Sequence, residues 1–394
     1  MNNRHFLALA LCALALSAQA ADPSSLVYFG TRGGGPPPAS AGAAPAPAPA
    51  PQGIYAARMD TKTGHLTSLG LQAELQRATW LVSNPSVPVI YAVASGPGGT
   101  AAESEMHSFA VDLASGKLRE LNKVGTGGRD ATHVAIDGTL KALFVANHGS
   151  GDVTVLPLNA DGSLGPVSSD QKTSGTGPHR RQTMPQPHGI AVSPDHGYVA
   201  MSDFGADRLY LYRVDRATRA LWPAATPFEP MPMGSGPRHL AFRPDGKFLY
   251  VNSELTAELF AFGRDAKTGA VHQLQRLSLY PANYAGTVEK SSAESAVSRD
   301  GRFLYISLRG DQNSLVVYAI DAKAGTLTEV QRLPSGGTSP WSFGIDPGGN
   351  WLLVTNVDSN TVNVFRVDRA SGRLTATGES LAVPSVIAVT FSGG

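Results

Sequence analysis

The stretch that decides the fold is GSGPRHLAFRPDGKFLYVNSEL, residues 234–255. Two runs rich in aliphatic and aromatic residues flank Pro-Asp-Gly, a composition typical of two short strands joined by a tight turn. Antiparallel pairing brings the two ends of such a hairpin together, and these ends carry Arg238, His239 and Glu254. The stretch therefore predicts a hairpin with a charged open end.

Related hairpins recur along the chain, which is the signature of a repeat architecture. A small or apolar residue in the middle of the first run marks each copy, and neighbouring markers are 48 to 56 residues apart. After each hairpin come a third run such as DRLYLYRVD, a turn of the type D-x-x-[ST/A]-G, and a short fourth run. This period with four short strands per unit predicts an all-β propeller of four-stranded antiparallel blades. The markers are Val82, Ala135, Ala191, Ala241, Ala296 and Gly344.

The two ends of the chain supply a seventh blade. VPSVIAVTF, residues 383–391, has the pattern of a first strand, and SLVYFGT, residues 25–31, that of a second strand with no first strand before it. Pairing these strands closes the ring and removes two exposed sheet edges. The sequence thus predicts one seven-bladed propeller domain over residues 21–394, with the Pro/Ala-rich stretch 33–53 as a loop insertion in the closing blade.

Residues 1–20, MNNRHFLALALCALALSAQA, read as a secretory signal peptide, with a short apolar run after a positive start. We expect cleavage near Ala20 and a periplasmic or secreted location. The single cysteine, Cys12, lies in this signal, so the mature chain offers no thiol for disulfides or catalysis. A net charge of +1 does not indicate nucleic-acid binding, and no later segment is apolar for long enough to span a membrane. We expect a monomer that binds a small molecule.

Two positions of each hairpin meet at one end of the ring, three residues before the marker and thirteen residues after it. If the residues at these positions only maintained the fold, they should be alike from blade to blade, as the turns are, but they differ. Such variation indicates an asymmetric ligand pocket. The first position holds Thr132, His188, Arg238, Ala293 and Trp341; the second holds His148, Phe204, Glu254, Arg309 and Val357; the residue after the first position is His133, Gly189, His239, Glu294 or Ser342.

Simpler roles remain open for some of these residues. Arg238 and Glu254, as neighbours across one hairpin, could form only a rim salt bridge. His133 or His239 could be a core histidine bonded to the next blade, and His148 could be a solvated loop residue. Motifs of serine hydrolases, zinc proteases, nucleotide sites and haem attachment are absent from the sequence, and we expect no metal or cofactor.

These residues resemble the bacterial and fungal seven-bladed lactonase family, which includes propeller-type 6-phosphogluconolactonases and 3-carboxy-cis,cis-muconate cyclases. The resemblance covers essentially the whole mature chain. It is most specific at RQTMPQPHGIAVSPD, DFGADRLYLYRVD, GSGPRHLAFRPDGKFLYVNSEL and AESAVSRDGRFLYISLRGDQNSLVVY. It implies a lactone site with His188, Arg238, Glu254 and Arg309 at catalytic and anion-binding positions, and with Arg181, Gln182 and Glu294 at further family positions.

The chain departs from the family pattern at several of these places. Gln186 and Ala296 stand where histidines are usual, Trp341 where arginine is common, and His148 where tyrosine is usual. The loss of an arginine and a histidine implies a substrate with less negative charge. A secretory signal implies the same, because phosphorylated sugar lactones are cytosolic metabolites.

On this interpretation the protein hydrolyses a sugar-type lactone. We expect His188 to be the base for water, because an imidazole titrates near neutral pH, and Glu254 to orient it or act as its acid–base partner. Arg238 and Arg309 suit oxyanion or carboxylate binding. Expected substrate-binding residues are Arg309, Glu294, His133, His239, Arg181 and Gln182. Two alternatives remain: a non-catalytic exported binding propeller, and a muconate-type cycloisomerase that uses the same residues without water.

Overall fold

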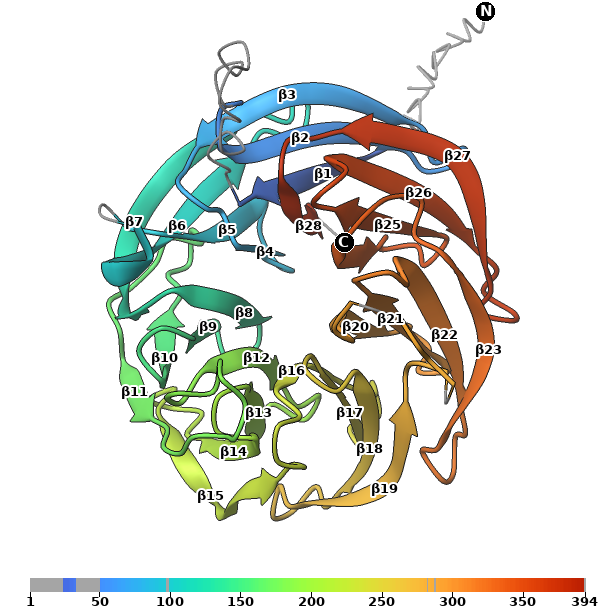
Figure 1. Ribbon diagram of the computed structural model, residues 1–394. Coiled ribbons are helices and arrows are strands. Elements are labelled where there is room, and N and C mark those ends of the chain that lie inside the picture. The colour runs from blue at the N-terminus through green and yellow to red at the C-terminus, as the bar shows by residue number, and fades with distance from the viewer. Residues whose placement is uncertain (1–23, 33–49, 97–98, 282, 287, 393–394) are drawn as a thin grey trace, which may run out of the picture.

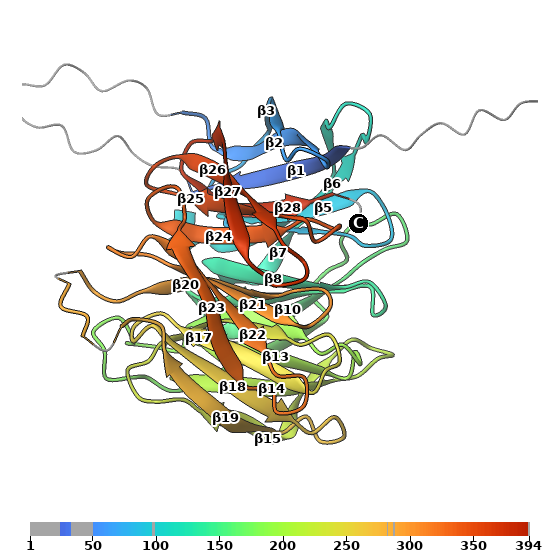
Figure 2. The same ribbon diagram turned by 90° about the vertical axis from the view of Figure 1, so that its right-hand side faces the viewer.

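Seven four-stranded antiparallel sheets surround a common axis (Figure 1), and Figure 2 shows the ring from its edge with the outer strands β23 and β27 facing the viewer. The computed structural model describes residues 24–32, 50–96, 99–281, 283–286 and 288–392. Each sheet is a blade whose strands run outward from the axis in chain order, except where the chain ends meet. The predicted seven-bladed propeller is therefore confirmed.

The blades are built from four sets of strands. The innermost are β4 (Trp80–Ser83), β8 (Ala131–Asp137), β12 (Pro187–Val192), β16 (Pro237–Phe242), β20 (Ser292–Val297), β24 (Pro340–Ile345) and β28 (Val386–Phe391). The second are β1 (Ser24–Thr31), β5 (Val89–Ala94), β9 (Ala142–Asn147), β13 (Tyr198–Asp203), β17 (Phe248–Ser253), β21 (Phe303–Leu308) and β25 (Trp351–Asn356). The third are β2 (Gly53–Asp60), β6 (Glu103–Val111), β10 (Asp152–Pro157), β14 (Arg208–Val214), β18 (Glu258–Arg264), β22 (Ser314–Ile320) and β26 (Thr361–Val367). The outermost are β3 (Leu66–Glu74), β7 (Leu118–Arg129), β11 (Ser169–Lys172), β15 (Leu221–Pro230), β19 (Val271–Ser278), β23 (Leu327–Pro334) and β27 (Leu374–Ala382).

The ends of the chain close the ring as the sequence predicts. β28 pairs antiparallel with β1, with Phe29 opposite Val389, and the order of this blade is β28-β1-β2-β3. Strands β1 and β2 pair across the Pro/Ala-rich stretch. Residues 33–49 of the expected 33–53 insertion, and the expected signal peptide 1–20, lie outside the described residues.

The hydrophobic core lies between blades. Among the described residues there are seven clusters of buried side chains, and each joins the second and third strands of one blade to those of the next. For example, Tyr250 and Leu259 pack with Leu304 and Val316. Full burial of one such aliphatic or aromatic side chain contributes about 1.5–3 kcal/mol. Every blade is thus held by both neighbours, and all seven inner strands stand next to one another around the axis.

A repeated tyrosine aligns the second strands of four blades. Each hydroxyl donates to the carbonyl of a turn glycine in the next blade at 2.8 to 3.1 Å, which fixes the height of one blade against the other. These pairs are Tyr28 with Gly116, Tyr91 with Gly162, Tyr250 with Gly325, and Tyr305 with Gly372. The described residues hold a single helical turn, the 3₁₀ segment η1 (Gly99–Ala101), and no helix among them has the length and apolarity to cross a membrane.

The two ends of the inner strands differ in backbone. At their starts, six of the seven strands carry a β-bulge, where the pairing with the second strand skips one or two residues. At their ends, tight turns lead from six of the inner strands into the second strands, and β28 ends the order of elements. We call these the bulge end and the turn end of the ring. The skipped residues are Thr132, His188, Arg238 with His239, Ala293 with Glu294, Trp341 and Ile387.

Candidate functional site

The bulges bring the predicted site residues together at one end of the axis. In a regular strand, consecutive side chains point to opposite faces, but a bulge redirects one of them. Arg238 Nη1 consequently lies 3.2 Å from Nε2 of the adjacent His239. Gly189 allows β12 to approach this segment, because a Cβ there would lie 2.4 Å from the Arg238 carbonyl oxygen. His188 is thereby held beside the β16 residues.

Glu254 is the centre of a cluster of arginines. Its Oε2 accepts from Arg238 Nε and lies 2.9 Å from Arg309 Nη2, and its Oε1 lies 2.8 Å from Arg181 Nη1. Burial alone would favour the neutral acid, but the charges of Arg309, Arg238 and Arg181 outweigh it and hold the pKa of Glu254 well below its usual range. The salt bridge left open by the sequence exists, but as one part of a buried cluster that keeps excess positive charge.

Arg238 is almost completely buried, with 2% of its surface exposed. Besides Glu254 and His239, its Nη1 donates to the carbonyl oxygen of Ala293 in the next blade at 2.6 Å. Burial and the nearby charge of Arg309 lower the pKa of Arg238 to about 10, so that it stays protonated at neutral pH. Arg238 therefore joins two blades and keeps its charge at the axis.

His239 has a defined tautomer. Its Nε2 accepts from the Arg238 guanidinium, which has only donors, so the proton sits on Nδ1, 2.8 Å from Glu294 Oε1. Burial and the charge of Arg238 hold the pKa of His239 well below its ordinary value. Glu294, whose pKa is raised by burial, also accepts from the Ser342 hydroxyl at 3.0 Å. These hydrogen bonds link three blades and are the arrangement expected of a core histidine.

His188 differs from His239 because its Nδ1 is buried without a hydrogen-bond partner among the described residues. Its ring lies 5.3 Å from that of His239 and 5.7 Å from that of His148. Burial, reinforced by the charge of Arg238, holds the pKa of His188 well below its ordinary value. An unpaired buried polar group costs about 1–3 kcal/mol, and in native proteins such a group calls for a functional explanation.

The expectation that Glu254 orients His188 is not met. No hydrogen bond joins the two side chains, and both Glu254 oxygens are taken by guanidinium groups. A carboxylate with so low a pKa is unprotonated at neutral pH and cannot serve there as a general acid. The structure gives Glu254 a different task, which is to hold three arginines together.

His133 lies between aromatic neighbours. Its ring centroid is 4.1 Å from that of Trp80 and 4.8 Å from that of His239, and its Nδ1 accepts from the Ile190 backbone. Burial, then the neighbouring His239, hold the pKa of His133 well below its usual value. His133 therefore forms a neutral wall of the site.

Arg181 and Gln182 are adjacent in sequence but have separate roles. Arg181 reaches Glu254 and lies over the ring of Phe204, with 4.7 Å from its Cζ to the centroid. Gln182 is buried, and its amide donates to the carbonyl oxygen of Phe204 and to Asp207. We interpret Gln182 as the residue that fastens this loop and so positions Arg181.

Trp80 was not identified from the sequence, whereas His148 was identified but left open as a solvated loop residue. Trp80 occupies the place equivalent to His133 and His239 but lies in the weakest hairpin copy, so its position was not used. His148 is at the same position as Glu254 and Arg309, and the structure packs it against His188 and Phe204 rather than in solvent. In both cases the register of the repeat contained the signal.

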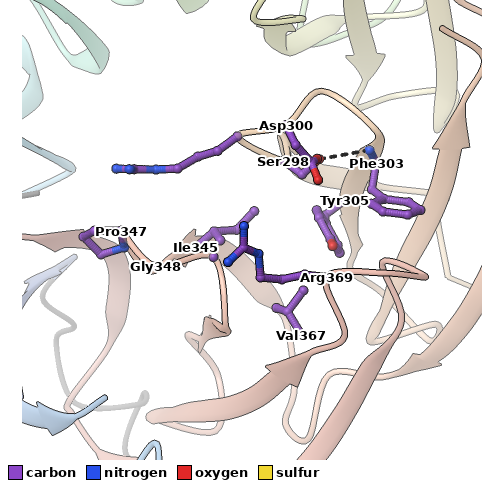
Figure 3. Close-up of a pocket in the computed structure, with 11 residues that line it drawn as sticks. Ser298, Asp300, Phe303, Tyr305, Ile345, Pro347, Gly348, Val367 and Arg369 are labelled. Carbon is purple, nitrogen blue, oxygen red and sulfur yellow. Dashed lines mark hydrogen bonds between the residues drawn. The ribbon is translucent and has the colours of Figure 1, made fainter. Parts of the chain in front are cut away.

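Cavities at the turn end include three of about 230, 360 and 550 Å³. Figure 3 shows the first of these, where Arg369 and Ile345 lie near Tyr305 and the Phe303 amide donates to Ser298 Oγ at 3.0 Å. None of the predicted site residues lines any of the three. Among the described residues, no group of three or more His, Cys, Asp or Glu is arranged to hold a metal ion.

Comparisons with known proteins agree with this architecture. The family described as "Lactonase, 7-bladed beta-propeller" matches residues 41–391. A 6-phosphogluconolactonase of Bacillus subtilis is 32% identical over 86% of this chain and 94% of its own length. Among solved structures, a periplasmic gluconolactonase of Pseudomonas aeruginosa is 33% identical, with a TM-score of 0.83 over 93% of this chain and 99% of that one. A Lactobacillus plantarum protein is 30% identical, with a TM-score of 0.81 over 93% and 99%. The chain therefore belongs to the seven-bladed β-propeller lactonase family.

Proposed function

We propose that this protein hydrolyses a sugar-type lactone at the bulge end of its ring. The observation that carries the proposal is the unpaired, neutral imidazole of His188 beside a buried cluster of three arginines and one carboxylate. A base with a free nitrogen and donors with excess positive charge are the two requirements of ester hydrolysis. The names of the Bacillus and Pseudomonas relatives support the same chemistry.

In this mechanism His188 accepts a proton from water as the water oxygen attacks the lactone carbonyl carbon. The carbonyl oxygen becomes an oxyanion, and Arg238 and Arg309 donate hydrogen bonds to it. The intermediate then collapses, the bond from the carbonyl carbon to the ring oxygen breaks, and the His188 imidazolium returns its proton to that oxygen. The product is an open hydroxy acid, which ionises to a carboxylate at neutral pH. Because the pKa of His188 is low, the base form is available at neutral pH.

The direct test is turnover of defined lactones by purified protein. Acid release from D-glucono-1,5-lactone and 6-phospho-D-glucono-1,5-lactone would be followed at constant pH and compared with spontaneous hydrolysis. We expect acceleration of at least one of them. Binding of both without any ring opening would contradict hydrolysis, and turnover of a muconate lactone alone would favour the cycloisomerase alternative.

We also propose that the protein is exported and acts outside the cytoplasm. The support is the signal-like sequence of residues 1–20 together with the periplasmic description of the Pseudomonas relative. Mass spectrometry of the mature N-terminus in fractionated cells tests this. Detection of an intact Met1 in the cytoplasmic fraction alone would contradict it.

A further inference from the structure

The repeat register identifies another residue at the bulge end that no sequence motif selected. Tyr28, Tyr250 and Tyr305 are equivalent, because each donates its hydroxyl to a turn glycine of the next blade. Four residues after Tyr250 and Tyr305 come Glu254 and Arg309, both members of the site. Four residues after Tyr28 comes Arg32. This equivalence is hard to see in the sequence, because the innermost strand of the closing blade, β28, comes from the other end of the chain.

The contacts of Arg32 agree with that position. Its backbone amide donates to the carbonyl oxygen of Ser385, just before β28, and its Cζ lies 5.4 Å from the centroid of the Trp341 ring. Arg309 and Arg238 approach the same ring, with Cζ distances of 4.5 and 5.6 Å. Trp341 is half-buried and is thus surrounded by three guanidinium groups at the bulge end.

The charge of Arg32 is not balanced as the others are. Arg238, Arg309 and Arg181 share Glu254, whereas Arg32 has no carboxylate partner among the described residues. The first blade, which carries Arg32, lies across the axis from β12, which carries His188 (Figure 1). The strands that carry His188 and Arg32 therefore lie on opposite sides of the axis, and Trp341 lies beside Arg32.

We propose that Arg32 and Trp341 form a subsite for a negatively charged group carried by the lactone at a distance from its ester. Arg32 would pair with a carboxylate or phosphate, and Trp341 would contact the carbon face of the ligand. This proposal rests on the lactone hydrolysis proposed above. It replaces the sequence-based expectation of a less charged substrate, since an arginine from the closing blade supplies the positive charge.

The test compares three lactones in the wild type and in Arg32→Gln. D-Glucono-1,5-lactone is neutral, 6-phospho-D-glucono-1,5-lactone carries a phosphate, and D-glucaro-1,4-lactone carries a carboxylate. We expect Arg32→Gln to raise KM for one or both charged lactones about tenfold or more, the worth of a charge-assisted hydrogen bond. KM for the neutral lactone should stay within about twofold. The matched control is Arg369→Gln, which removes an exposed arginine at the turn end.

Whichever charged lactone responds identifies the group that Arg32 binds. Equal effects of Arg32→Gln on all three lactones, or no effect on any, would overturn the proposal. If the wild type opens none of them, calorimetry with gluconate, 6-phosphogluconate and glucarate separates the two proposals. Tighter binding of the acids with the second negative charge, lost in Arg32→Gln, supports the subsite even where hydrolysis fails, and its absence refutes the subsite.

Discussion

The bulge end and the turn end of the inner strands use the same kinds of charged residue in different ways. At the turn end, Asp195 pairs with Arg264 of the next blade, and its other bonds go to the Ser193 hydroxyl and the Gly197 amide of its own turn. At the bulge end, Glu254 receives three guanidinium groups from three separate segments. The ion pair of Asp195 with Arg264 joins two blades, whereas the three guanidinium groups around Glu254 concentrate positive charge at one point.

The comparison also separates cavity size from chemistry. The cavities at the turn end reach about 550 Å³, yet their arginines Arg299, Arg366 and Arg369 are exposed. At the bulge end, Arg238, Arg309 and Glu254 are all buried, and buried charges interact more strongly than exposed ones. Burial and convergence of charge, rather than volume, therefore mark the candidate site.

Replacing one histidine at each end gives the largest expected contrast. His188→Ala removes the proposed base, and we expect kcat/KM for the best lactone to fall by about 10²–10⁴-fold. His196→Ala removes a turn-end histidine whose Nδ1 lies 2.6 Å from Asp137, and we expect kcat/KM to change by less than about twofold. Steady-state kinetics measures kcat/KM of both variants, and circular dichroism verifies that both are folded. Comparable losses in the two variants would remove the distinction between the ends.

Two buried arginines provide the next contrast. Arg238→Met removes one of the three guanidinium groups around Glu254, and Arg264→Met removes the arginine that pairs with Asp195. We expect both to lower the free energy of unfolding, by up to about 3–5 kcal/mol. The effect should be smaller for Arg264, because Asp195 is 41% exposed. Only Arg238→Met should also lower kcat, by about 10²–10³-fold, because Arg238 is a proposed oxyanion donor and Arg264 lies at the turn end. Urea unfolding and kcat are measured on both.

A parallel loss of kcat in Arg264→Met would show that destabilisation alone explains the effect. A normal kcat in Arg238→Met would show that Arg238 has only a structural role, such as its hydrogen bond to the Ala293 carbonyl of the next blade.

The frame could be predicted from sequence because it repeats. Marker residues, hairpin turns rich in Pro, Asp and Gly, and the D-x-x-[ST/A]-G turns recur in most blades, so the strand order and the closing pair β28 and β1 followed from pattern alone. Most site residues also followed, because they break the pattern at fixed positions. Two residues were harder to identify from the sequence: Trp80, because its hairpin is the weakest copy of the repeat, and Arg32, because the two chain ends divide its blade.

The Arg238–Glu254 ion pair could be predicted because it lies within one hairpin, but most other connections between site residues run between blades. Neither the pairing of His239 with Glu294 nor the sharing of Glu254 by three arginines follows from hairpin register. The bulges that place Arg238 and His239 side by side depend on local backbone geometry, which the sequence pattern does not encode. The structure shows no hydrogen bond by which Glu254 would orient His188, because both Glu254 oxygens contact guanidinium groups.

The bulge end should also be the acid-sensitive end. His133, His188 and His239 have folded-state pKa values well below those of an unfolded chain because burial disfavours their charged form. Above pH 6.5 these histidines are neutral in both the folded and the unfolded chain. As the pH falls below 6.5, the unfolded chain takes up protons and the folded chain does not, so the free energy of unfolding falls. We expect a loss of about 1 kcal/mol per histidine for each pH unit. Urea unfolding at pH 7.5 and 5.5 measures it, and His133→Asn should reduce the loss. An unchanged free energy of unfolding across this range would contradict the assignment of neutral buried histidines.

The smallest effect is expected where the cavity in Figure 3 is altered. Arg369→Ala shortens a lining side chain without touching the backbone carbonyl that accepts from Arg302, so the turn should keep its structure. We expect the free energy of unfolding to change by less than about 0.5 kcal/mol, because the side chain is exposed. KM for each lactone should likewise stay within about twofold, because the proposed lactone site lies at the other end of the inner strands. A rise in KM with unchanged stability would place the ligand in the turn-end cavity and reverse the comparison, since volume would then locate the site better than converging charge.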